Sequence, residues 1–197
     1  MHNKQPTNLI LGSTSPFRKE LLERLRLDFT TDSPDIDETP LHNEKPEDYV
    51  IRLSLEKAKA VASRHENALI IASDQCSVLN GKIRGKPRNH QNAIKQLTES
   101  SGNRVSFLTG LCLYDCKDDS YQLEMVPFHV DFRDLTATEI ESYLQAEKPY
   151  GCAGSFKSEG LGVTLFKRLE GEDPSSLIGL PLIKLSEMLR LKGFLLP

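Results

Sequence analysis

Short apolar runs alternate with longer stretches of helical periodicity along this chain. Residues 8–12 (NLILG) and 68–74 (ALIIASD) are apolar runs bounded by polar residues, which is typical of buried strands. Residues 46–65 repeat their apolar positions at helical spacing and predict a helix with one buried face. A second helix is predicted from Pro16, because Ser15 is a favoured N-cap and proline fits the first helical position.

The remainder of the chain continues this alternation. Asn80-Gly81 is a favoured two-residue turn and predicts a hairpin after the strand at 68–74. Further helices are predicted over residues 89–99, 136–147 and 181–191, and further strands over 105–114, 124–132 and 163–169. The pattern predicts an α/β fold with a mixed sheet. No internal repeat or linker interrupts it, so we expect residues 1–197 to form a single domain.

The predicted helix from Pro16 begins with two basic residues. Arg18 and Lys19 stand in its first turn, where the helix dipole disfavours positive charge. They make sense if an anion binds to the free N–H groups there and to Arg18. The alternative is that both are ordinary surface cations. The segment is not a P-loop, because the chain has no G-x-x-x-x-G-K-[ST] motif.

Two charged residues stand in apolar surroundings. Lys57 falls on the apolar stripe of the helix over 46–65, so it either extends to the surface or meets an anion such as phosphate. Asp74 ends the apolar run 68–72, where a carboxylate can hold Mg²⁺ or orient a water, although a turn aspartate has the same pattern.

Weaker signals follow. Lys86 lies between a glycine and a proline, the glycine-rich segment 153–162 contains Glu159, and Glu38 ends the acidic run DIDE. Each also occurs in ordinary loops. Together, scattered cations and a few carboxylates suit a phosphate ester with a divalent metal.

Composition excludes several classes of protein. There are 25 basic and 28 acidic residues and a net charge of −3, which disfavours a nucleic-acid coat or a membrane-surface protein. The four cysteines form no C-x-x-C pair, and no histidine has metal-ligand spacing. No apolar run is long enough to span a bilayer and no signal-peptide pattern begins the chain, so we expect a cytoplasmic protein with reduced thiols.

Taken in order, the motifs resemble those of the Maf family of nucleotide pyrophosphatases. The matching segments are LILGSTSPFRKELL, DIDETP, RLSLEKA, IIASDQ, GKP and AGSFKSEGLG. The resemblance implies an elongated mixed sheet flanked by helices, with two lobes and a deep central cleft, as in inosine triphosphatases. It also implies cleavage of nucleoside triphosphates between the α and β phosphates, a divalent cation (Mg²⁺ or Mn²⁺) and a possible homodimer.

The resemblance also assigns residue roles. Asp74 matches the proton acceptor, and Glu38 matches a carboxylate near the metal and the reacting phosphate, so the predicted metal ligands are Glu38 and Asp74. The residues that match substrate-binding positions are Ser13, Phe17, Arg18, Lys57, Gln75, Lys86, Lys157 and Glu159.

Three of these positions are associated with substrate choice in the family. Gln75 and the segment GSFKSEG resemble the branch that hydrolyses 7-methyl-GTP, whereas the dTTP/UTP branch usually has threonine at position 75. Phe17 stands where the 7-methyl-GTP branch often has tryptophan, and an aromatic ring there can stack on a cationic methylated purine. The alternatives are a pyrophosphatase for dTTP, UTP or a broad range of nucleotides, and a nucleotide-binding regulator of cell division without turnover.

Overall fold

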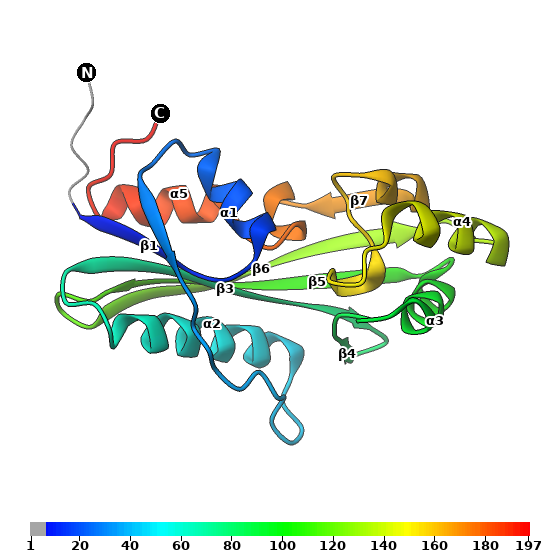
Figure 1. Ribbon diagram of the computed structural model, residues 1–197, viewed down its shortest axis with the longest axis horizontal. Coiled ribbons are helices and arrows are strands. Elements are labelled where there is room, and N and C mark those ends of the chain that lie inside the picture. Colours follow the sequence, from blue (N-terminus) through cyan, green and yellow to red (C-terminus); the bar gives the residue numbers. More distant parts are fainter. Residues whose placement is uncertain (1–6) are drawn as a thin grey trace. The chain divides into compact units, whose positions relative to one another are not determined.

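The computed structural model describes residues 7–197 (Figure 1). In chain order the elements are β1 Asn8–Gly12, α1 Pro16–Glu23, β2 Phe29–Asp32, α2 Pro46–Ala62, β3 Ala68–Leu79, β4 Lys82–Arg84, α3 His90–Ser100, β5 Arg104–Asp115, β6 Ser120–Phe132, α4 Ala137–Glu147, β7 Phe166–Gly171 and α5 Leu182–Leu191. Short 3₁₀ turns lie at Ala153–Ser155, Leu161–Leu165 and Pro174–Leu177. Among the described residues, no helix is both long and apolar enough to cross a membrane.

The strands form one mixed sheet. Its order is β2-β1-β3-β5-β6-β7, and β4 pairs with β3 outside this path. Strand β1 is parallel to β2 and β3, whereas β4 is antiparallel to β3 and β7 is antiparallel to β6. The predicted α/β class with a mixed sheet is confirmed.

The chain divides into two compact units. The first comprises the described residues up to Asp74, together with Thr109–Val126 and Asp173–Pro197. The second comprises Gln75–Leu108 and Pro127–Glu172. Strand β3 contributes to both, and the boundary falls between Asp74 and Gln75. The deep cleft and the single domain implied by the sequence stay predictions.

The first unit has helices on both faces of its strands (Figure 1). Leu9 and Leu11 of β1 are buried in a cluster that includes Leu21 of α1 and also residues of α5. Ile10, which alternates with them, is buried in another cluster with Val61 of α2. This alternation follows from the two-residue period of a strand and explains why β1 is apolar at every position facing a helix.

A cluster of aromatic rings forms part of the core of the second unit. Phe156 packs edge to face on Phe107, Phe132 and Phe166, with ring centroids 4.8–5.7 Å apart. Gly154 lies against this cluster with φ 75°, and a Cβ there would come within 2.6 Å of the Phe107 ring. The aromatic cluster therefore fixes the start of the glycine-rich segment.

Local sequence signals predicted several element ends correctly. The Ser15 hydroxyl accepts a hydrogen bond from the Arg18 amide and caps α1, as expected. The turn at Asn80-Gly81 has φ 51° and 73°, which is the backbone that an Asn-Gly hairpin turn requires. Thr136 and Glu139 form a capping box at the start of α4, where the sequence predicted a helix to begin.

Three predictions about strands were wrong. Asp74 does not end its strand, because β3 continues without interruption to Leu79. Strand β2 was missed, since its sequence FTTD is short and contains a single apolar residue. The last strand begins at Phe166 and ends at Gly171, because residues up to Leu165 form a 3₁₀ turn instead.

Candidate functional site

Lys57 lies between two carboxylates in the first unit. Its Nζ is 2.5 Å from Asp74 Oδ1 and 2.5 Å from Glu38 Oε1. Lys57 and Asp74 are only 4% and 6% exposed, whereas half of the Glu38 side chain is accessible. Lys57, on the apolar stripe of α2, therefore pairs with two carboxylates of the chain itself, and the phosphate suggested for it by the sequence stays a prediction. The trio carries one net negative charge.

Arg18 adds a second cation to this group. Its Nε donates a 2.8 Å hydrogen bond to the Gly179 carbonyl. Burial lowers the pKa of the Arg18 guanidinium, while the charges of Asp74 and Glu38 act to raise that pKa. The charges of both carboxylates therefore act on this half-buried arginine, and the binding of an anion by Arg18 stays a prediction.

Ser13 lies buried at the turn between β1 and α1. Its Oγ accepts a 3.1 Å hydrogen bond from the Ser15 amide. Phe17 stands in the first turn of α1 and is half-buried. The turn from Ser13 through Arg18 thus presents a hydroxyl, an aromatic ring and a guanidinium from one short segment.

The backbone around Asp74 is held by two buried serines. The Asp74 amide donates to Ser54 Oγ at 3.0 Å, and Ser54 Oγ donates to the Val50 carbonyl one turn earlier on α2. Ser73 Oγ lies 2.7 Å from the Gly110 carbonyl and 2.9 Å from the Gly179 carbonyl. Since Arg18 also donates to Gly179, one carbonyl oxygen links Arg18 to the residue that precedes Asp74. The sequence analysis missed both serines; the signal for Ser54 was its polar side chain on the stripe that carries Lys57.

Gly110 lets α2 approach β5 at this point. A Cβ at Gly110 would lie 2.3 Å from the Val50 carbonyl oxygen and 2.5 Å from Ser54 Oγ. We expect Gly110→Ala to lower the free energy of unfolding by about 1–3 kcal/mol, because backbone must shift to admit the methyl group. Urea denaturation measures this loss, and the exposed Gly151→Ala, where a Cβ meets nothing within 4 Å, is the matched control. Equal stability of the two variants would contradict the close approach.

Glu38 is positioned by contacts between its loop and α2. Tyr49 Oη donates to the Glu38 carbonyl at 3.0 Å, and Arg52 Nη2 donates to the Thr39 carbonyl at 3.3 Å. Arg52 is itself held by Glu44, whose carboxylate is 2.6 Å from Arg52 Nε. The pKa of Glu44 is lowered, chiefly by this hydrogen bond. The loop backbone that carries Glu38 is thus fixed against α2.

Four predicted site residues belong to the second unit. Lys157, Glu159 and Lys86 all act electrostatically on the thiol of Cys152, whose pKa burial raises to about 11. Glu159 raises that pKa further, and the two lysines act in the opposite direction. Gln75, the fourth, is half-buried on β3 directly after Asp74.

Glu147 organises the glycine-rich segment and was missed by the sequence analysis. Its carboxylate lies 3.2 Å from Lys157 Nζ and accepts a 3.0 Å hydrogen bond from the Leu161 amide. A Cβ at Gly160 would come within 2.8 Å of the same carboxylate. The loop at Gly160 therefore lies directly against the Glu147 carboxylate. Nothing in the local sequence marks this residue, because it looks like an ordinary surface glutamate of α4.

The carboxylates suit a divalent cation of the hard, oxygen-preferring kind. Glu38 and Asp74 each have a carboxylate oxygen 2.5 Å from Lys57 Nζ, so the two carboxylates lie close to each other. Within residues 7–197, no cluster of three or more histidine, cysteine, aspartate or glutamate side chains has the geometry of a metal cage. Mg²⁺ typically takes one or two carboxylates and completes its shell with water and substrate phosphates. The pair fits that mode of binding.

Comparison with known protein families gives a match over most of the chain. A family model described as "Maf-like protein" matches residues 8–192. The chain belongs to the Maf family. Every residue predicted for the site lies inside the matched range.

Two curated relatives are similar over nearly their whole length. A protein of Alcanivorax borkumensis named 7-methyl-GTP pyrophosphatase is 53% identical over 197 residues, which is 100% of both chains. A protein of Colwellia psychrerythraea with the same name is 55% identical over 185 residues, or 94% of this Maf chain and 92% of the relative. Among solved structures, a Ham1 protein of Staphylococcus aureus is 16% identical with a TM-score of 0.46, covering 64% of this chain and 72% of that one.

Proposed function

We propose that this Maf protein hydrolyses 7-methyl-GTP to 7-methyl-GMP and diphosphate. The observation that supports the proposal best is that Lys57 forms ion pairs with both Asp74 and Glu38. The charges of these two carboxylates also act on Arg18. A buried carboxylate can accept a proton from water, and two cations beside it can stabilise the negative charge of a polyphosphate. The names of the two relatives, which are more than half identical to this chain, support the choice of substrate.

Each charged residue has a distinct task in this proposal. Asp74, held in place by Ser54, orients the attacking water and accepts its proton. Lys57 has three ammonium protons and uses two on carboxylates, so one remains for a phosphate oxygen. Arg18 and Lys57 neutralise the charge that grows on the leaving diphosphate. Ser13 donates its hydroxyl to a phosphate oxygen.

Glu38 and Asp74 are the residues that would hold a divalent cation. When bound, such a cation neutralises phosphate charge and favours attack at phosphorus. We expect a chelator to abolish turnover and Mg²⁺ or Mn²⁺ to restore it, which a diphosphate-release assay measures directly. Full activity after chelation would contradict this part of the proposal.

The remaining predicted residues select the substrate. Phe17 stacks on the methylated purine, whose positive charge favours an aromatic face. Gln75 and Glu159 supply hydrogen-bonding groups for the purine edge, and Glu159 also attracts the cationic ring electrostatically. Lys86 and Lys157 bind phosphate oxygens. Since Lys157 is paired with Glu147, its position is already fixed within the second unit.

A competition assay separates this proposal from its alternatives. Diphosphate release is measured with 7-methyl-GTP, GTP, UTP and dTTP, singly and mixed in pairs. We expect the highest kcat/KM for 7-methyl-GTP, and Glu159→Gln should narrow its advantage over GTP by about tenfold, since one charge-assisted contact is lost. Equal values for all four nucleotides would favour a broad pyrophosphatase, and binding without any turnover would favour a regulator.

A further inference from the structure

Arg84 carries buried donors that nothing in the described chain satisfies. Its Nη2 donates to the Gln96 carbonyl at 2.7 Å and to Ser100 Oγ at 3.2 Å. Its Nε and Nη1 are buried and have no hydrogen-bond partner among residues 7–197. A buried guanidinium N–H without a partner is costly, so such groups normally meet an acceptor.

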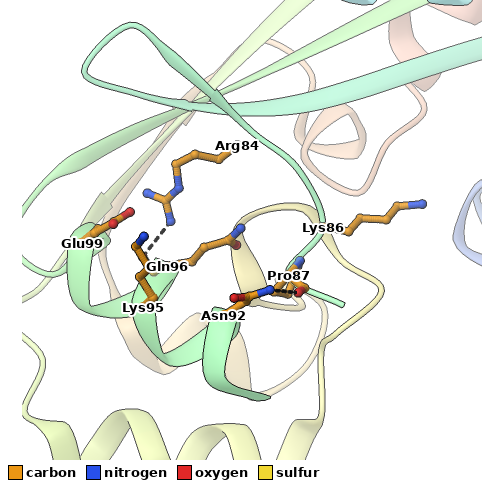
Figure 2. Close-up of a pocket in the computed structure, with 7 residues that line it drawn as sticks. All are labelled: Arg84, Lys86, Pro87, Asn92, Lys95, Gln96 and Glu99. Atoms are coloured by element: carbon orange, nitrogen blue, oxygen red, sulfur yellow. Dashed lines mark hydrogen bonds between the residues drawn. The ribbon is translucent and has the colours of Figure 1, made fainter. Parts of the chain in front are cut away.

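Arg84 is also one of the residues that line a cavity of about 250 Å³ within the second unit. We call it the Arg84 pocket, and its lining includes Arg84, Lys86, Asn92, Lys95, Gln96 and Glu99 (Figure 2). A water molecule in liquid occupies about 30 Å³, so the pocket has room for an anion of phosphate size with water around it. Lys95 and Glu99 are exposed and leave a path from solvent.

The charge of the pocket favours an anion. Two cationic side chains, Arg84 and Lys95, and one anionic side chain, Glu99, belong to its lining. Glu99 acts to raise the pKa of Arg84, while burial, the larger effect, lowers that pKa. The single carboxylate is thus within electrostatic range of Arg84 but does not hydrogen-bond to its Nε or Nη1.

Two side-chain amides that line the pocket hold one of its walls in place. Asn92 Nδ2 donates to the Pro87 carbonyl at 3.0 Å, and Gln96 Nε2 donates to the Gly85 carbonyl at 2.9 Å. These bonds fasten the segment that carries Lys86 to α3. In Figure 2 the Lys86 side chain points away from the Arg84 guanidinium, so that lysine is free to serve substrate while its backbone borders the pocket.

We propose that the Arg84 pocket is a binding site for a small phosphate-type oxyanion, held by Arg84 and Lys95. Phosphate oxygens are charged acceptors, and arginine binds them with strong and often bidentate hydrogen bonds. An anion there also ties α3 to the Gly85–Pro87 segment through Arg84, and so stabilises the backbone that carries Lys86. The site is separate from the roles proposed above for Lys86, and neither Arg84 nor Lys95 has a part in the proposed hydrolysis.

Titration with inorganic phosphate tests this proposal. The probe is added at constant ionic strength, with chloride as the exchanged ion, and the Arg84 Nε–H resonance is followed by NMR. We expect a saturable shift. Lys95→Gln should weaken binding about two- to fivefold, the effect of one partly exposed charge, and Glu99→Gln should tighten it by a similar factor. Lys167→Gln, an exposed lysine of the same unit outside the pocket, should leave the affinity unchanged.

Three results would overturn the proposal. The Arg84 resonance does not move with phosphate, or it moves without saturating, or Lys95→Gln and Lys167→Gln weaken binding equally. In each case water or a rotated Glu99 satisfies the guanidinium instead. Because these readouts do not involve turnover, their failure leaves the proposed hydrolysis untouched. Repeating the titration with diphosphate distinguishes a site for the single anion from one for the larger product.

Discussion

Asp74→Asn should lower kcat for 7-methyl-GTP by about a thousandfold, the usual range for loss of a positioned general base. The amide keeps the shape of the side chain and the Asp74 backbone bond to Ser54, but it cannot accept a proton from water. Lys57 keeps Glu38 as a partner, so the fold should survive. Steady-state diphosphate release measures the loss, and circular dichroism confirms the fold.

Nucleotide binding provides the internal check on this variant. Arg18 and Lys57 remain in place, so 7-methyl-GTP should still bind. Asp48→Asn, at an exposed position in the first turn of α2, is the matched control and should keep full activity. If Asp74→Asn turned over substrate at a near-normal rate, the assigned role of the carboxylate would be wrong.

Lys57→Met should be among the most destabilising changes in the first unit. The side chains of Lys57 and Asp74 are 5% and 9% exposed, and removing one partner of a buried ion pair costs about 3–5 kcal/mol. The cost arises because Asp74 is left as a buried charge, with Glu38 as a second negative charge beside it. Urea denaturation measures the change in the free energy of unfolding.

A double variant separates this charge effect from lost packing. In Lys57→Met with Asp74→Asn the buried charge is gone, so the double variant should be more stable than Lys57→Met alone. Lys59→Met, at an exposed position on the same helix, should change stability by less than about 0.5 kcal/mol. If the two single losses in the free energy of unfolding simply added up in the double variant, the ion pair would contribute no interaction energy.

Local patterns predicted much of the fold because the determining interactions are local. A hydroxyl that caps α1, an Asn-Gly turn and a capping box each act within a few residues, so Ser15, Asn80 and Thr136 could be interpreted from the sequence. Lys57 was singled out because a charge on an apolar stripe must either extend to the surface or find an anion. Which partner it finds depends on chain segments far apart in the sequence.

The supporting contacts of the site could not be predicted for that reason. The Gly179 carbonyl accepts hydrogen bonds from the side chains of Arg18 and Ser73, which are 161 and 106 residues away along the chain. Asp74 looked like a strand end because polar residues follow it, yet Cys76 and Ser77 continue β3 as buried strand positions. A small buried polar residue resembles a turn residue in sequence, and only its long-range hydrogen bonds distinguish the two.

Hydrolysis of 7-methyl-GTP in water labelled with oxygen-18 tests the central claim most directly. If Asp74 delivers water to the α phosphorus, one labelled oxygen appears in 7-methyl-GMP and none in diphosphate, as mass spectrometry of the products can determine. Label in the diphosphate, or release of orthophosphate in place of diphosphate, would place the attack at another phosphorus and contradict the account.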